Sequence, residues 1–127
     1  MTDRVESLAK SAGGWRVICL CAAWCGVCRD WLPVLREVQA ARPDVAFAWI
    51  DVEDEDEAMG EVDIVTFPTV LVAQGNHARF LGPVPPMRKQ LLQLLDRLQA
   101  QAPAVSADAE TNLLLARLQP LLARSAL

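Results

Sequence analysis

Residues 15–28 read WRVICLCAAWCGVC, a mostly apolar run that ends in two cysteines two residues apart. The first part, residues 15–22, is rich in strand-forming side chains and predicts a buried central strand. A helix is expected to follow at once, beginning at Cys25 or Val27 and ending at Ala41, with apolar residues at helical spacing. The stretch therefore predicts a Cys-x-x-Cys pair at a strand-to-helix junction.

The chemistry of this pair follows from its place at the start of a helix. Cys25 and Cys28 at such a junction lie within reach of a disulfide. We expect Cys25 at the positive end of the helix, where free N–H groups and the helix dipole stabilise a thiolate. We expect Cys28 to be tucked against the helix and to resolve a mixed disulfide formed on Cys25. The pair therefore predicts thiol–disulfide exchange.

The rest of the chain predicts alternating helices and strands. The expected segments are a helix at 3–11, a strand at 45–52, a short weak helix at 55–61, a hairpin with strands at 70–73 and 78–81, and a helix at 87–101. Two strands joined through a crossover helix should be parallel, and the hairpin should complete a sheet with helices on both faces.

The chain is expected to divide into a domain at residues 1–101 and a tail at 102–127. The tail begins with a Pro/Ala/Ser linker and continues into a Leu-rich helical segment at 109–119, interrupted by Pro120. The leucines form an apolar surface that must be covered. They are expected to fold back on the domain, to form a homodimer with a second chain, or to dock on a client protein.

Composition limits the partners and the compartment. With 127 residues, 53% of them hydrophobic and 22% charged, the chain is expected to fold as a globular protein. The net charge of −4 and the absence of a basic cluster argue against a nucleic-acid partner. No apolar run reaches the roughly 18–20 residues of a membrane span. The start of the chain has no secretory or transit pattern, so a cytoplasmic protein with no membrane partner is predicted.

All four cysteines lie between Cys19 and Cys28, so they cannot staple distant parts of the chain. Cys19 and Cys21 alternate with apolar residues and should share one face of the strand, where packed thiols are expected. A sharper hypothesis is that Cys19 lies under the active site and exchanges with Cys28. A zinc or iron–sulfur site would need the strand pair to converge with an outward-pointing Cys25, so no metal and no cofactor are predicted.

The sequence WCGVC at residues 24–28 resembles the Trp-Cys-Gly-Pro-Cys centre of the thioredoxin family. Pro33 stands where that family kinks its active-site helix, and residues 67–69 (Phe-Pro-Thr) look like its cis-proline loop. The resemblance covers residues 5–98. It implies a thioredoxin-like α/β fold, with a central four-stranded mixed sheet flanked by helices and, in this chain, a C-terminal helical extension.

The resemblance also implies an activity, that of a thiol–disulfide oxidoreductase or protein disulfide reductase. Cys25 would attack the disulfide of a protein substrate, Cys28 would resolve the mixed disulfide, and a separate thiol reductase would recycle the pair. The residues that the resemblance places along the substrate groove are Trp24, Gly26, Phe67, Pro68 and Gly82.

Two departures from the family pattern qualify this expectation. Val27 replaces the proline between the cysteines, which should make the dithiol less reducing than thioredoxin at roughly −270 mV. Cys19 and Phe47 stand where the family has an aspartate and a lysine, so general-base help to Cys28 should be weaker. An alternative function is therefore a redox-sensing or chaperone-like binding module with little turnover.

Overall fold

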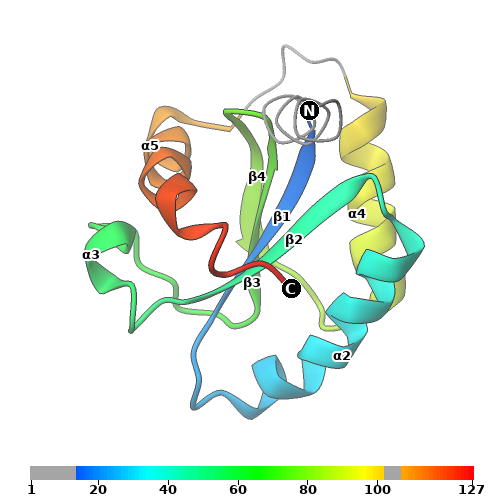
Figure 1. Cartoon of the computed structure of the whole chain (residues 1–127), viewed down its shortest axis with the longest axis horizontal. Coiled ribbons are helices and arrows are strands. Elements are labelled where there is room, and N and C mark those ends of the chain that lie inside the picture. The colour runs from blue at the N-terminus through cyan, green and yellow to red at the C-terminus, as the bar shows by residue number, and fades with distance from the viewer. Residues whose placement is uncertain (1–13, 102–106) are drawn as a thin grey trace, which may run out of the picture.

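The computed structural model describes residues 14–101 and 107–127 (Figure 1). The elements, in chain order, are β1 (Trp15–Cys21), α2 (Gly26–Ala41), β2 (Val45–Asp51), α3 (Asp56–Met59), β3 (Thr69–Gln74), β4 (His77–Pro83), α4 (Arg88–Ala100), α5 (Ala109–Leu118) and the 3₁₀ turn η1 (Gln119–Leu121). Each strand and helix predicted within these ranges is present, with ends shifted by a few residues. The helix expected at 3–11 and most of the predicted linker lie outside the described residues.

The four strands form one mixed sheet in the order β2-β1-β3-β4. β1 pairs with β2 in parallel and with β3 antiparallel, and β3 pairs with β4 antiparallel. The parallel pair is joined through α2, because parallel neighbours need a long crossover connection. β1 lies between two strands and is fully buried from Val17 onward. The predicted four-stranded mixed sheet flanked by helices is confirmed.

One face of the sheet packs against α2 and α4, which lie side by side in Figure 1. The strand contributes Val17, Cys19 and Cys21 to this core. The buried stripe of α2 consists of Cys28, Trp31, Leu35 and Val38. Trp31 is 1% exposed, whereas Leu32 and Gln39 on the same helix are only half-buried.

The other face packs against α3 and α5, on the opposite side of the sheet in Figure 1. Here Ile18 and Leu20 of β1 pack against four buried leucines of the tail, Leu114, Leu115, Leu118 and Leu122. These tail leucines are therefore covered by the chain's own sheet. Because they are buried within one chain, they are not exposed for the homodimer or client contact considered above.

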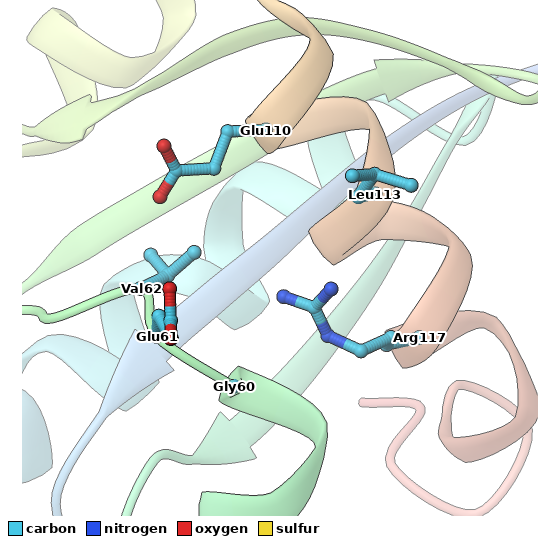
Figure 2. Close-up of a pocket in the computed structure, with 6 residues that line it drawn as sticks. All are labelled: Gly60, Glu61, Val62, Glu110, Leu113 and Arg117. Atoms are coloured by element: carbon cyan, nitrogen blue, oxygen red, sulfur yellow. The ribbon is translucent and has the colours of Figure 1, made fainter.

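Arg117 of α5 holds the tail helix to the turn after α3. Its Nε donates to the Ala58 carbonyl at 2.7 Å, and its second guanidinium nitrogen donates to the Met59 carbonyl at 3.2 Å. Figure 2 shows the guanidinium reaching from α5 toward this turn. Gly60 follows α3 with φ of 61°, a conformation that glycine adopts without a steric penalty. This turn ends α3 at Met59, short of the predicted residue 61.

Residues close to the end of the sequence add to the edge of the sheet beside β2. Trp49 N donates to the Ser125 carbonyl at 2.9 Å, and Leu127 N donates to the Phe47 carbonyl at 3.0 Å. Ala48 and Ala126 form an antiparallel bridge between these two bonds. The tail therefore supplies hydrogen-bond partners to an edge strand as well as an apolar cover to one face.

Candidate active site

The two cysteines of the pair stand at the junction between β1 and α2. Cys25 occupies the position before the helix, and its N–H donates to the Ala22 carbonyl at 3.0 Å. Its own carbonyl accepts from Arg29 N at 3.2 Å, which starts the hydrogen bonding of the helix. Cys25 is partly exposed, whereas Cys28, one turn on, is fully buried. The helix start therefore presents one thiol and covers the other.

The surroundings shift the pKa values of these two thiols in opposite directions. Hydrogen bonds from the Cys28 backbone and thiol, one from the Val27 backbone and the nearby charge of Arg29 lower the pKa of Cys25. Burial raises the pKa of Cys28, and the neighbouring Cys21 thiol raises it further. The arrangement therefore favours ionisation of Cys25 and protonation of Cys28.

Two more thiols lie beneath the pair. Cys19 and Cys21 are both fully buried, with their sulfur atoms 3.1 Å apart. Cys21 and Cys28 lie in the same buried cluster, close enough that each thiol affects the pKa of the other. The sequence hypothesis had placed Cys19 next to Cys28. The structure instead places Cys21 there, because Cys21 ends β1 on the same face, two residues closer to the helix start.

No group of three or more His, Cys, Asp or Glu side chains in residues 14–101 and 107–127 is arranged to hold a metal ion. The four cysteines are therefore not set out as a metal site in this structure. Within the same residues, no helix has the length and the apolar character needed to cross a bilayer.

Trp24 and Phe67 form an aromatic corner beside the pair. Their ring centroids are 5.6 Å apart and nearly perpendicular, and Trp24 is 61% exposed. The peptide bond between Phe67 and Pro68 is cis. A cavity of about 240 Å³ adjoins this corner, and the residues that line it are Trp24, Val52, Glu53, Asp56, Met59, Val62, Asp63, Ile64 and Phe67.

The two glycines predicted for the groove do not line this cavity. Gly26 is exposed at the first residue of α2, where an added Cβ would meet only Arg29 at 4.0 Å. Gly82 pairs with Val70 near the start of β3, and a Cβ there would come within 3.0 Å of the Phe80 ring. Pro68 is buried, and its carbonyl accepts from Val84 N at 3.2 Å.

Sequence reasoning missed Asp51 and Glu53, which belong to an acidic stretch at residues 51–57 with no evident link to the cysteine pair. Asp51 Oδ2 accepts from Ala23 N at 2.8 Å, and Oδ1 accepts from the N–H groups of Glu53 and Asp54. Glu53 accepts from the Trp24 indole N–H at 2.9 Å. A usable signal was present, because the parallel strands β1 and β2 end at one edge and Cys21 is paired with Asp51.

A second cavity, of about 450 Å³, lies between the turn after α3 and helix α5. Figure 2 shows Glu61 and Val62 on one side of it and Glu110, Leu113 and Arg117 on the other. No cysteine lines this cavity, so it is separate from the thiol pair. Sequence reasoning gave no indication of it, because the two walls are distant in the chain.

Comparison with known proteins gives one consistent result. The thioredoxin family model matches residues 5–96. A thioredoxin of Streptomyces coelicolor is 32% identical over 49% of this chain, and the match spans 46% of that protein's length. An H-type thioredoxin of Fagopyrum esculentum is 33% identical over 75% of this chain and 78% of its own.

Structural comparison agrees with the sequence matches. The solved thioredoxin of Fasciola hepatica superposes with a TM-score of 0.62, covering 76% of this chain and 91% of the other at 23% identity. This likeness supports the fold, and the family model covers well over half of the sequence. The chain therefore belongs to the thioredoxin family of thiol–disulfide oxidoreductases.

Proposed function

We propose that this chain exchanges disulfides with protein substrates, with Cys25 as the attacking nucleophile and Cys28 as the resolving thiol. The Cys25 thiolate attacks one sulfur of a substrate disulfide, a mixed disulfide forms, and the other substrate sulfur leaves as a thiolate. Cys28 then loses its proton and attacks the Cys25 sulfur. The substrate leaves with both of its sulfur atoms as thiols, having gained two electrons. Cys25 and Cys28 have lost those electrons and are joined by a disulfide.

The observation that carries this proposal is the contrast between the two thiols. The partly exposed Cys25 has a lowered pKa, which makes its thiolate, the nucleophile, easier to form. The buried Cys28 has a raised pKa, so it stays protonated until the mixed disulfide has formed beside it. This division suits a two-step exchange, because attack and resolution need different thiols at different times.

We place the substrate against the aromatic corner. Trp24 and Phe67 offer apolar surface next to Cys25, and the backbone around the cis Pro68 would take an extended peptide. Gly26 and Gly82 are proposed to leave room for that peptide, since Gly26 is exposed with open space where a Cβ would be. The hydrogen bond from Trp24 to Glu53 supports this placement, because it fixes the indole at the corner.

The resolution step is proposed to be slower than in a typical thioredoxin. Cys19 and Phe47 occupy the positions of the family's aspartate and lysine, and both are buried in the apolar core. A thiol with a raised pKa and weak general-base help loses its proton reluctantly. Val27 between the cysteines is proposed to shift the potential to a less reducing value than roughly −270 mV.

We further propose that the pair is recycled by a separate thiol reductase in the cytoplasm. Exchange that reduces substrates leaves the chain oxidised after each turnover, so a reductant is required for the next one. The reducing glutathione and thioredoxin pools of the cytosol suit such a cycle.

The alternative function is a binding module in which the dithiol only tunes the contact with a partner. Two features favour this alternative in the sequence, the Leu-rich tail and the weak general-base help at Cys28. The tail would have held the partner. Leu114, Leu115 and Leu118 of α5 are instead buried against the chain's own sheet. The other support, weak general-base help at Cys28, remains, and turnover distinguishes the two functions.

Trapping with Cys28→Ser tests the proposal. This variant keeps the nucleophile and lacks the resolving thiol, so it should accumulate a mixed disulfide on Cys25 with a model protein disulfide such as that of insulin. Mass spectrometry identifies the adduct, and Cys25→Ser is the matched control that should form none. The wild type should reduce the same disulfide repeatedly with dithiothreitol as the terminal reductant. No adduct on Cys25 contradicts the nucleophile assignment, and an adduct without turnover favours the binding module.

A further inference from the structure

Behind the proposed active site, three buried thiols lie in one core cluster. Cys28 comes from the first turn of α2, and Cys19 and Cys21 come from the face of β1 on which that helix packs. All three side chains are fully buried. The sulfur atoms of Cys19 and Cys21 are 3.1 Å apart, and Cys21, at the end of β1, packs in the same cluster as Cys28 in the first turn of α2. The exchange described above uses Cys28 and leaves Cys19 and Cys21 without a role.

We propose that Cys21 is a second disulfide partner of Cys28, so that the oxidised protein interconverts between an outer disulfide, Cys25 with Cys28, and an inner disulfide, Cys21 with Cys28. This inference rests on the proposed function, which forms the outer disulfide. It adds a third redox-active cysteine at the end of β1, next to the buried side of the pair.

The step is an isomerisation that consumes no external oxidant or reductant. The Cys21 thiol loses its proton and attacks the Cys28 sulfur. The bond between Cys28 and Cys25 breaks, the bond between Cys28 and Cys21 forms, and Cys25 leaves as a thiolate. The proton released from Cys21 passes to water or to Cys25. Two sulfurs are oxidised before the step and two are oxidised after it.

The different environments of the sulfurs favour the inner disulfide at equilibrium. A thiolate is best accommodated on Cys25, which has a lowered pKa, and a thiol of low pKa is also the better leaving group. The hydrogen bond with Cys19 and burial raise the pKa of Cys21, so of the two thiols that can be left free, Cys25 is the one that ionises more easily. The same raised pKa makes the attack slow, because the thiolate is scarce.

Register identifies Cys21 rather than Cys19 as the partner. Side chains on one face of a strand recur every second residue, so the two cysteines lie in a row along β1. Cys21 is the last residue of β1, five residues before the first residue of α2. It lies in the same buried cluster as Cys28 and affects the pKa of Cys28. Cys19 lies two residues earlier in the strand, across from Trp49 and Val70, and its sulfur lies 3.1 Å from that of Cys21.

The inner disulfide would change what the oxidised protein can do. It leaves Cys25 as a free thiolate at the surface while Cys28 is occupied. Cys25 can then attack a substrate disulfide, but Cys28 cannot release the substrate until a thiol reductant reduces the inner disulfide to the Cys21 and Cys28 thiols. The oxidised chain would therefore hold a substrate covalently, whereas the reduced chain would turn it over.

Two double variants test the pairing directly. Cys19→Ala with Cys25→Ser keeps only Cys21 and Cys28, and Cys21→Ala with Cys25→Ser keeps only Cys19 and Cys28. Each is equilibrated with glutathione disulfide, quenched in acid, unfolded and treated with N-ethylmaleimide. The first should lose two hydrogens in mass and take up no maleimide, and the second should take up two. If the first keeps both thiols reactive, or if the second also closes, the proposal is wrong.

Folding and function are controlled separately. Circular dichroism checks each variant, and Cys19→Ser or Cys21→Ser, which is close in size, replaces an alanine variant that does not fold. In the oxidised wild type, iodoacetamide should alkylate Cys25, and in Cys21→Ser this alkylation should be lost. Wild-type turnover of insulin with dithiothreitol is measured in parallel. Turnover without inner closure overturns only this inference, whereas closure without turnover overturns only the proposed function.

Discussion

Cys25 and Cys28 are separated by less than one helical turn, yet one is suited to attack and the other to wait. The difference comes from what each thiol meets: backbone N–H groups and Arg29 for Cys25, and the apolar core and Cys21 for Cys28. A helix start provides the first environment through its free N–H groups, and the strand beneath it provides the second. Reactivity at this site is therefore assigned by position in the fold.

The alkylation of Cys25 should follow this assignment as the pH changes. Because its pKa is lowered, the reactive thiolate persists at a pH below the ordinary thiol value of about 8.5 and is lost as the pH falls through the lowered pKa. Iodoacetamide rates between acid and alkaline pH, measured on reduced Cys28→Ser, give this midpoint. A midpoint at or above the ordinary value would contradict the assignment.

Arg29→Gln tests the charge contribution to that midpoint. Removing the guanidinium should move the midpoint upward by about half a pH unit or less, because Arg29 is exposed and solvent screens its interaction with Cys25. Arg36→Gln removes an equal charge two turns further along the same helix and should leave the midpoint unchanged. Equal shifts in both variants would indicate a general effect of net charge.

At this scale the sequence predicted the pair and the aromatic corner but not their supports. A Cys-x-x-Cys motif at a strand-to-helix junction determines its own chemistry, because the helix start supplies the N–H groups. Cys21 was passed over for Cys19 because the expectation followed the family's aspartate position. Asp51 was missed because an acidic run looks solvated until the parallel pairing of β1 with β2 brings it beside Ala23.

At the scale of elements, the helix of the tail, α5, covers part of one face of the sheet. It presents Leu114, Leu115 and Leu118 to the β1 face that carries Ile18 and Leu20. Asp108 caps its first turn by accepting from Thr111 N at 2.8 Å, and Pro120 lies within the 3₁₀ turn that follows. The tail is therefore a built part of the core.

Replacing one of these leucines should cost stability. Leu115→Ala removes a side chain that is 1% exposed and leaves a cavity, so the free energy of unfolding should fall by about 2–5 kcal/mol. Leu113→Ala, on the 61% exposed side of the same helix, should change it by about 0.5 kcal/mol or less. Urea unfolding measures both. Similar costs for the two variants would show that α5 does not pack as described.

Periodicity predicted the elements better than their ends or their partners. The leucine spacing in the tail indicated a helix, and Pro120 indicated where it stops. The same leucines fitted a second chain or a client equally well, because an apolar stripe does not identify what covers it. The end of α3 depended on the backbone conformation of Gly60 and on bonds from Arg117, which lies far along the chain.

At the scale of the whole molecule, the last residues and β2 protect one another. The bonds from Trp49 to Ser125 and from Leu127 to Phe47 occupy an edge whose open N–H and C=O groups would otherwise face solvent. Gln39 of α2 also donates to the Leu127 carbonyl at 3.0 Å. Segments that are far apart in the sequence therefore share one boundary of the sheet.

Deleting residues 125–127 should open this edge. The Trp49 amide loses its acceptor and should exchange its hydrogen roughly fivefold faster or more, since one hydrogen bond contributes about 1 kcal/mol. Amides of β1, which lies between β2 and β3, should be little changed. Hydrogen exchange followed by NMR compares the two sets. Equal acceleration throughout would show global destabilisation in place of local opening.

The packing of α5 also bears on how the protein is made. During synthesis the ribosome releases β1 to β4 before it releases the leucines of α5. The part of the sheet that α5 covers therefore stays exposed to solvent until α5 has left the ribosome. A nascent chain in that state exposes Ile18 and Leu20 to any chaperone near the exit tunnel. The elements that surround Cys25 and Cys28, on the opposite face, are synthesised before α5. Redox chemistry at Cys25 could therefore begin before α5 has packed on the sheet.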